Sequence, residues 1–240
     1  MMRQIFSTFG AVALCASVGM PKTALAESQQ GSEQGVVVEL YTSQGCVSCP
    51  PADKLMAKLA TTPGVIGLSL HVDYWDYIGW TDTFGQPAFT DRQKAYAKAA
   101  GEKMIYTPQM IVAGGARVAG NQPEEVAKAL AAVKPSPVVL NLTRQGDDLL
   151  ISASAAQALP GTVSVHLVHY TDQALVDIDR GENAGLKVAY HNIVTSWQTL
   201  GTWAGAEPLK MQAPAGEGPV VVLLQAGPGP GQVIAAARLK

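Results

Sequence analysis

The stretch from residue 35 to residue 60 constrains the fold more than any other part of the chain. It begins with the β-branched run "GVVVELY", which is typical of a buried strand, and continues into a Cys-x-x-Cys pair, Cys46 and Cys49. The pair is followed by "PPADKLMAKLA", in which two prolines suit a first helical turn and apolar residues recur at helical spacing. The sequence therefore predicts a strand, a cysteine pair and a helix in direct succession.

Further elements are predicted along the N-terminal half. A second buried strand over residues 65–72 completes a strand, helix, strand unit, the arrangement of a parallel βαβ. A helix over residues 90–100 has Thr90 as its N-cap, and "MIYTPQMIVAGGARVAG" has the pattern of a hairpin with a glycine turn. A last helix is predicted over residues 123–133.

The segment "KPSP", residues 134–137, marks a change in the period of the hydrophobic pattern. Beyond it, short runs such as "VVLNLTR" and "TVSVHLVHY" are separated by turn-forming stretches such as "LPG" and "GPGPG". Many short strands at this spacing are typical of an antiparallel sandwich. The sequence therefore predicts an α/β domain over residues 35–134 and an all-β sandwich domain over residues 135–240.

The N-terminus has the pattern of a removable export signal. An apolar stretch over residues 5–20 follows a single basic residue, and Ala24 and Ala26 fit a small-x-small cleavage site. The stretch contains Ser, Thr and Gly and falls short of the ~20 apolar residues that a membrane-spanning helix needs. We expect cleavage of residues 1–26, a short N-terminal segment over residues 27–34, and a periplasmic or secreted protein without a membrane span.

Charge and cysteine content narrow the function. Removing residues 1–26 takes Arg3 and Lys22 from the 17 basic residues and none of the 19 acidic ones, which leaves a net charge of −4. A weakly acidic chain without a basic patch argues against nucleic acid and anionic membranes as partners. Cys15 lies in the removed stretch, so the mature chain keeps only the Cys-x-x-Cys pair.

A metal site is one use of such a pair. Zinc needs about four ligands, usually including a second Cys or His pair at similar spacing, whereas the four histidines of this chain are scattered. Cu(I) held by both thiolates and His71 is harder to exclude, because soft sulfur suits this ion. We therefore predict no metal and no other cofactor, and we keep copper delivery as an alternative.

A structural disulfide is a second use, and redox exchange is a third. A disulfide between the two cysteines closes only a short ring, which constrains the unfolded chain little, because the entropic stabilisation grows with loop length. Redox exchange needs two neighbouring sulfurs at an accessible position. The sequence favours redox exchange and leaves the other two interpretations open.

Position assigns different roles to the two sulfurs. At the amino end of a helix, the N–H groups of Val47, Ser48 and Cys49 can point at the sulfur of Cys46, and the helix dipole favours a thiolate there. We expect Cys46 to be the exposed, attacking thiol. Cys49, one turn further, is expected to be buried and to break the mixed disulfide that forms between Cys46 and a substrate.

The order of these elements, with the Thr-Pro of "YTPQMIV" before the hairpin, resembles the thioredoxin fold. The resemblance implies a cis-proline that faces the cysteines, here Pro108, preceded by Thr107. It also implies a buried acid on the first strand that helps to move protons; the nearest candidate is Glu39, seven residues before Cys46 where six are usual. The absence of a histidine between the cysteines favours a reductase or isomerase over an oxidase.

The motifs "ELYTSQGCVSCPPAD", "HVDYWDYIGW", "RGENAG" and "YHNIV" are together similar to those of an uncharacterised secreted bacterial family, domain of unknown function 1223. This similarity implies a thioredoxin-like domain and export, and it names no substrate. The sequence therefore predicts an exported thiol–disulfide oxidoreductase that acts on protein thiols or disulfides and has an unidentified redox partner.

Two other segments carry open interpretations. The aromatic segment over residues 73–80 is either a substrate-binding lip or a small satellite core. The "RGENAG" segment, residues 180–185, is either a binding loop or a well-formed turn. A non-catalytic binding protein that uses the sandwich domain and the aromatic segment for recognition is the main alternative to an oxidoreductase.

Overall fold

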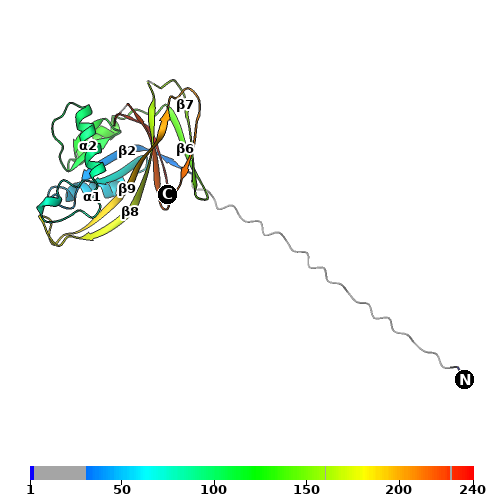
Figure 1. Cartoon of the computed structure of the whole chain (residues 1–240), viewed down its shortest axis with the longest axis horizontal. Coiled ribbons are helices and arrows are strands. Elements are labelled where there is room, and N and C mark those ends of the chain that lie inside the picture. The colour runs from blue at the N-terminus through cyan, green and yellow to red at the C-terminus, as the bar shows by residue number, and fades with distance from the viewer. Residues whose placement is uncertain (3–30, 160, 228) are drawn as a thin grey trace.

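The computed structural model describes residues 1–2, 31–159, 161–227 and 229–240 (Figure 1). The helices within these residues are α1 (Pro50–Leu59), the 3-10 turn η1 (Asp76–Ile78), α2 (Pro87–Ala99) and α3 (Pro123–Ala131). The strands are β1 (Glu33–Gln34), β2 (Val36–Thr42), β3 (Val65–His71), β4 (Gln109–Val112), β5 (Ala116–Ala119), β6 (Val138–Gln145), β7 (Asp148–Ala155), β8 (Val163–Asp177), β9 (Lys187–Trp203), β10 (Leu209–Pro214), β11 (Val220–Ala226) and β12 (Val233–Leu239).

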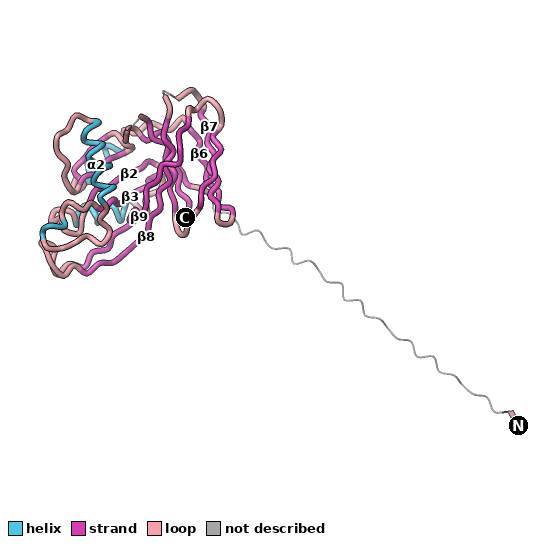
Figure 2. Tube along the Cα trace, in the orientation of Figure 1, coloured by secondary structure: helices cyan, strands magenta, loops and turns pink. Residues whose placement is uncertain are grey.

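Nine of these strands form one continuous sheet in the order β1-β12-β11-β8-β9-β3-β2-β4-β5, and the other three form a smaller sheet in the order β10-β7-β6. Within the larger sheet β3 runs parallel to β2 and to β9, whereas the other neighbouring strands are antiparallel. Figure 2 shows that strands make up most of the trace and that the helices gather at one end of it.

The face of the large sheet that packs against α2 is called the α2 face here. Side chains of a strand alternate between the two faces of its sheet. Val37 and Tyr41 of β2 therefore point to the same side, where they form one core with Phe89 and Tyr96 of α2. Val221 of β11 belongs to the same core, so the α2 face extends across strands from both halves of the chain.

The opposite face of the sheet, called the α1 face, is covered by helices at the β2 end. Val38 and Leu40 of β2 pack there against Ala52 and Met56 of α1, and Val126 of α3 joins the same core. The helical spacing of Ala52 and Met56 explains this contact, because residues four apart lie on one side of a helix.

The smaller sheet covers the other end of the large one. Val220 and Val222 of β11 pack against Leu140 of β6 and Ile151 of β7. Figure 1 shows β6 and β7 at the end of the molecule away from α1 and α2. The core at this end of the molecule therefore lies between the smaller sheet and one part of the large sheet.

The predicted fold class, an α/β thioredoxin-like domain followed by an all-β antiparallel sandwich, is nevertheless wrong. The protein is mostly β, with a large curled mixed sheet and three helices in its described part. Strands from beyond residue 135 join the same sheet as β2 and β3. The hydrophobic periodicity of a segment indicates its secondary structure but not which distant strand it pairs with. The boundary between residues 134 and 135, in the connection from α3 to β6, stays a prediction.

Several local predictions differ from the structure. The helix predicted over residues 90–100 begins at Pro87, and the hydroxyl of Thr90 donates to Asp73 instead of capping the helix. The runs around residues 163–177 and 187–203 are two strands of 15 and 17 residues, not a series of short ones. The hairpin of β4 and β5 is confirmed.

The predicted signal peptide, residues 1–26, lies outside the described residues apart from Met1 and Met2, and so do residues 27–30 of the predicted N-terminal segment. Among the helices that the structure does describe, none is long and apolar enough to cross a membrane.

The contact between β3 and β9 joins the two halves of the large sheet. A single backbone bridge pairs Ser69 with Ile193. Two side chains reinforce it: Ser69 Oγ donates to the carbonyl of His191 over 2.8 Å, and Asn192 Nδ2 donates to the carbonyl of Gly67 over 2.8 Å. This junction carries the hairpin of β8 and β9, yellow and orange in Figure 1, to the end of the molecule that holds the helices.

A buried ion pair lies on the α2 face. Arg92 Nε of α2 and Glu39 Oε2 of β2 are 2.8 Å apart, and the Glu39 side chain is fully buried. Tyr41 and Tyr96 also donate hydrogen bonds to the Glu39 carboxylate, and Arg92 bonds Gln225 of β11. The pair therefore links α2 to strands from both halves of the chain.

Replacing Arg92 with Met should lower the free energy of unfolding by about 3–5 kcal/mol, because it leaves the carboxylate of Glu39 buried without its positive partner. Lys94→Met is the matched control, since Lys94 and its partner Asp91 are exposed. Urea unfolding measures both. A loss below ~1 kcal/mol for Arg92→Met, equal to that of the control, would show that the pair does not hold α2 to the sheet.

Candidate functional site

Cys46 and Cys49 form a disulfide between the end of β2 and the start of α1, with a Cα–Cα distance of 5.4 Å. Cys49 is the N-cap of α1, and Pro50 and Pro51 begin the helix as predicted. Cys46 is only 1% exposed and Cys49 is 0% exposed. The expectation of an exposed Cys46 is therefore wrong for the disulfide state; the exposed residues lie between the cysteines, where Val47 is 61% exposed.

The groups around the sulfurs also differ from the expectation. The N–H of Cys49 does not point at the sulfur of Cys46 but donates to its carbonyl oxygen over 3.1 Å. The hydroxyl of Ser48 lies 3.5 Å from Cys46 Sγ. A hydroxyl at this distance can donate to a thiolate, so Ser48 can stabilise the thiolate of Cys46.

The loop before the cysteines is fastened by Gln44, which is fully buried. Its backbone N–H donates to Asp82 Oδ2 over 2.7 Å, and its side-chain Oε1 accepts from Trp80 Nε1 over 2.8 Å. The carbonyl of Gln44 accepts a hydrogen bond from Asn183, which lies in the connection between β8 and β9. The loop is thus held in place before it reaches Cys46.

The aromatic segment over residues 73–80 lies against this loop. A Cβ placed at Gly45 would be 3.3 Å from the Cβ of Trp75, so the two backbones approach closely. Trp75 Nε1 donates to Thr107 Oγ1 over 2.7 Å. Tyr77 is 80% exposed, whereas Trp75 and Trp80 are partly buried, so the segment forms a small packed unit with one protruding ring.

The peptide bond between Thr107 and Pro108 is cis, which confirms this part of the prediction. Ser48 Oγ and the carbonyl oxygen of Thr107 are 3.5 Å apart. A Cβ placed at Gly120 would lie 3.1 Å from the Cβ atoms of both Ala52 and Pro108, which places Pro108 beside the first turn of α1. Thr107 and Pro108 therefore do lie near the cysteine pair.

Glu39, predicted as the buried acid of the site, lies on the opposite face of the sheet from the helix that Cys49 caps. It is buried, but it points to the α2 face, where it bonds Arg92 and two tyrosines. The helix α1, whose N-cap is Cys49, lies on the α1 face. The side-chain alternation of β2 explains the difference, because Glu39 lies out of phase with Val38 and Leu40, which face the helix.

Asp53 is the acid on the cysteine side, and the sequence analysis missed it. It lies four residues after Cys49, on the same side of α1, and is 3% exposed. Thr42 Oγ1 donates to its Oδ1 over 2.8 Å, whereas its buried Oδ2 has no partner. Burial raises the pKa of Asp53 to about 7, although His71 and the Thr42 hydrogen bond oppose this shift. The helical offset from Cys49 was the available sequence signal.

His71 and Asp82 form a buried pair near Asp53. His71 Nδ1 and Asp82 Oδ2 are 2.8 Å apart, both side chains are fully buried, and His71 Nε2 has no partner. His71 is thus bonded to a carboxylate, as expected of a core histidine. Within the described part of the chain, no group of three or more His, Cys, Asp or Glu side chains has a metal-binding arrangement.

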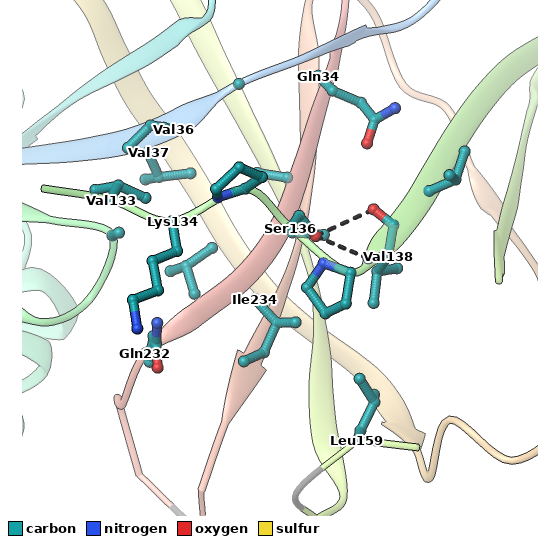
Figure 3. Close-up of a pocket in the computed structure, with 18 of the residues that line it drawn as sticks. Gln34, Val36, Val37, Val133, Lys134, Ser136, Val138, Leu159, Gln232 and Ile234 are labelled. Atoms are coloured by element: carbon teal, nitrogen blue, oxygen red, sulfur yellow. Dashed lines mark hydrogen bonds between the residues drawn. The ribbon is translucent and has the colours of Figure 1, made fainter. Parts of the chain in front are cut away.

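A cavity of about 720 Å³ lies elsewhere, between the connection after α3 and strand β12. Figure 3 shows its lining, with Val36, Val37 and Ile234 on apolar walls and Lys134 beside Gln232. Neither cysteine lines this cavity, so we do not associate it with the chemistry of the disulfide.

Comparisons with known proteins give a family and a fold. The sequence model of the family described as "Protein of unknown function (DUF1223)" matches residues 37–225. Protein AGR_C_4864 from Agrobacterium tumefaciens, a solved structure, has 35% sequence identity and a TM-score of 0.76; the match covers 85% of this chain and 93% of that one.

HBP35 of Porphyromonas gingivalis is a more distant solved structure, with 14% identity and a TM-score of 0.58 over 86% of this chain and 74% of that one. This likeness concerns the fold alone. No curated protein matches the chain.

Asp53→Asn should remove a pH-dependent part of the stability. The folded-state pKa of Asp53, about 7, lies above its ordinary 3.8, so the folded protein keeps a proton that the unfolded chain releases. The stability of the wild type therefore falls as the pH rises from about 4 to about 7, and the variant escapes this loss.

The free energy of unfolding of Asp53→Asn relative to the wild type should grow by up to about 4 kcal/mol across this window. Urea unfolding at three pH values measures the difference. A difference that stays constant with pH would mean that Asp53 does not titrate in this range.

Proposed function

The chain belongs to the DUF1223 family, and we propose that it is a thiol–disulfide oxidoreductase whose Cys46 and Cys49 exchange electrons with cysteines of other proteins. The observation that carries this proposal is the disulfide at the N-cap of α1. It links residues only three apart in sequence and joins no distant elements, so it adds little to stability. Reversible thiol–disulfide exchange is a function that such a bond can serve.

In the reduced protein, the thiolate of Cys46 attacks a disulfide of a partner protein. A bond forms between Cys46 and one partner sulfur, and the other partner sulfur leaves as a thiolate. Cys49 then loses its proton and attacks Cys46, which forms the intramolecular disulfide and releases the second partner thiolate. The partner gains two electrons and takes up two protons, and a dithiol protein must reduce the Cys46–Cys49 disulfide again.

Asp53 is the group best placed to take the proton from Cys49. It lies on the same side of α1, one helical turn away, and its Oδ2 has no partner. A carboxyl with a pKa near 7 can accept and return a proton at neutral pH. The absence of a histidine between the cysteines favours a reductase or isomerase over an oxidase. The export-signal pattern of residues 1–26 supports a proposed location in the periplasm or the medium.

A non-catalytic binding protein is the second candidate, and the burial of both sulfurs favours it. A disulfide that partner proteins cannot reach takes no part in thiol–disulfide exchange. The two candidates differ in whether Cys46 ever forms a bond with another protein.

Cys49→Ser should trap mixed disulfides with partner proteins from an exported extract, because the second step is blocked, whereas the matched variant Cys46→Ser should trap almost none. Non-reducing gels followed by mass spectrometry identify the complexes. Equal trapping by both variants would refute the assigned roles. Trapping by neither would favour the binding protein.

A further inference from the structure

The tip of the β8–β9 hairpin, residues 178–186, is closed by its own backbone. The N–H of Ile178 donates to the carbonyl of Leu186 over 2.9 Å, and the N–H of Gly185 donates to the carbonyl of Ile178 over 2.7 Å. Gly181 has a φ of 78°, and a Cβ there would be 3.1 Å from the Cβ of Trp80. The tip is therefore a compact turn that packs against the aromatic segment.

The side-chain amide of Asn183, at this tip, donates hydrogen bonds to the cysteine loop. It is 4% exposed, and its Nδ2 donates to the carbonyl of Gln44 over 2.8 Å and to the carbonyl of Cys46 over 3.0 Å. These partners are 139 and 137 residues away in sequence. Because an amide nitrogen has two hydrogens, both donors are used on the loop that carries the reactive sulfur.

We propose that Asn183 is a positioning residue for exchange at Cys46. Carbonyl oxygens carry partial negative charge and oppose a thiolate nearby. The Asn183 amide holds the carbonyls of Gln44 and Cys46 and offsets that charge, which favours the thiolate of Cys46 over its thiol. This inference rests on the proposed function and adds a role for the "RGENAG" segment in the same site.

The geometry separates this role from that of an ordinary turn asparagine. A turn asparagine usually bonds backbone groups one or two residues away. Here the turn is closed without the Nδ2 of Asn183, and that nitrogen reaches across to another element. The carbonyl of Cys46 already accepts the N–H of Cys49, so Asn183 supplies its second hydrogen bond.

Several titratable or charged side chains lie on the elements packed around the site, and the substitutions below leave all of them in place. They include Asp53 on α1, His71 at the end of β3, Asp73, Asp76 and Asp82 in the connection from β3 to α2, and Asp179, Arg180 and Glu182 on the hairpin tip.

The test uses the reduced full chain and the rate at which iodoacetamide alkylates Cys46, followed against pH by peptide mass spectrometry. Asn183→Ala removes both donors without adding charge, and Asn183→Asp keeps the shape while replacing the donors with an acceptor. Asn141→Asp is the control for the Asn-to-Asp change itself, because Asn141 is exposed and lies on β6 of the smaller sheet, which contributes no residue to the cysteine loop.

Both Asn183 variants should move the midpoint of the Cys46 alkylation profile to higher pH and lower the rate at neutral pH by about 3- to 10-fold, with the larger effect for Asp. The control should keep the wild-type midpoint. Thermal unfolding checks that each variant is folded.

Two outcomes would overturn the proposal. The first is a midpoint that stays at the wild-type value in both Asn183 variants. The second is a rate that rises equally at every pH, since that is the sign of a loosened loop and not of a changed thiol. The midpoint is measured without a protein substrate, so a failure of the oxidoreductase proposal itself would appear separately, as an absence of trapped complexes.

Discussion

The junction between β3 and β9 is the contact on which the rest of the structure depends. It consists of one backbone bridge, Ser69 with Ile193, supported by the side chains of Ser69 and Asn192. Through it, four antiparallel strands from the C-terminal half extend a sheet that the N-terminal half begins. The junction also sets the position of the β8–β9 hairpin, which carries Asn183 to the cysteine loop.

The chemistry of the site depends on which face of the sheet each acid occupies. Glu39 points to the α2 face, where Arg92 and two tyrosines use its carboxylate for stability. Asp53 lies on the α1 face, and one of its carboxylate oxygens has no hydrogen-bond partner. Burial raises its pKa to about 7, so the carboxyl still holds its proton just below neutral pH. A buried acid that is fully paired stabilises the fold, whereas one with a free oxygen is available for proton transfer.

The sequence predicted local features better than distant ones. The strand and helix around Cys46 and Cys49 follow from periodicity and proline placement, and the cis bond before Pro108 was implied by the resemblance to the thioredoxin fold. The continuous sheet was not predicted, because strand pairing between distant segments leaves no periodic signal. For the same reason the contact from Asn183 was missed, and the strand alternation that excludes Glu39 from the site was overlooked.

The most direct test of the central claim is the reduction potential of the Cys46–Cys49 pair in the folded wild type, measured by equilibration with dithiol redox buffers. Exchange with other proteins predicts a reversible two-electron transition above about −300 mV, where thiol–disulfide oxidoreductases work. A pair that stays oxidised below that potential, or that is reduced only when the protein unfolds, would contradict the claim and identify the bond as structural.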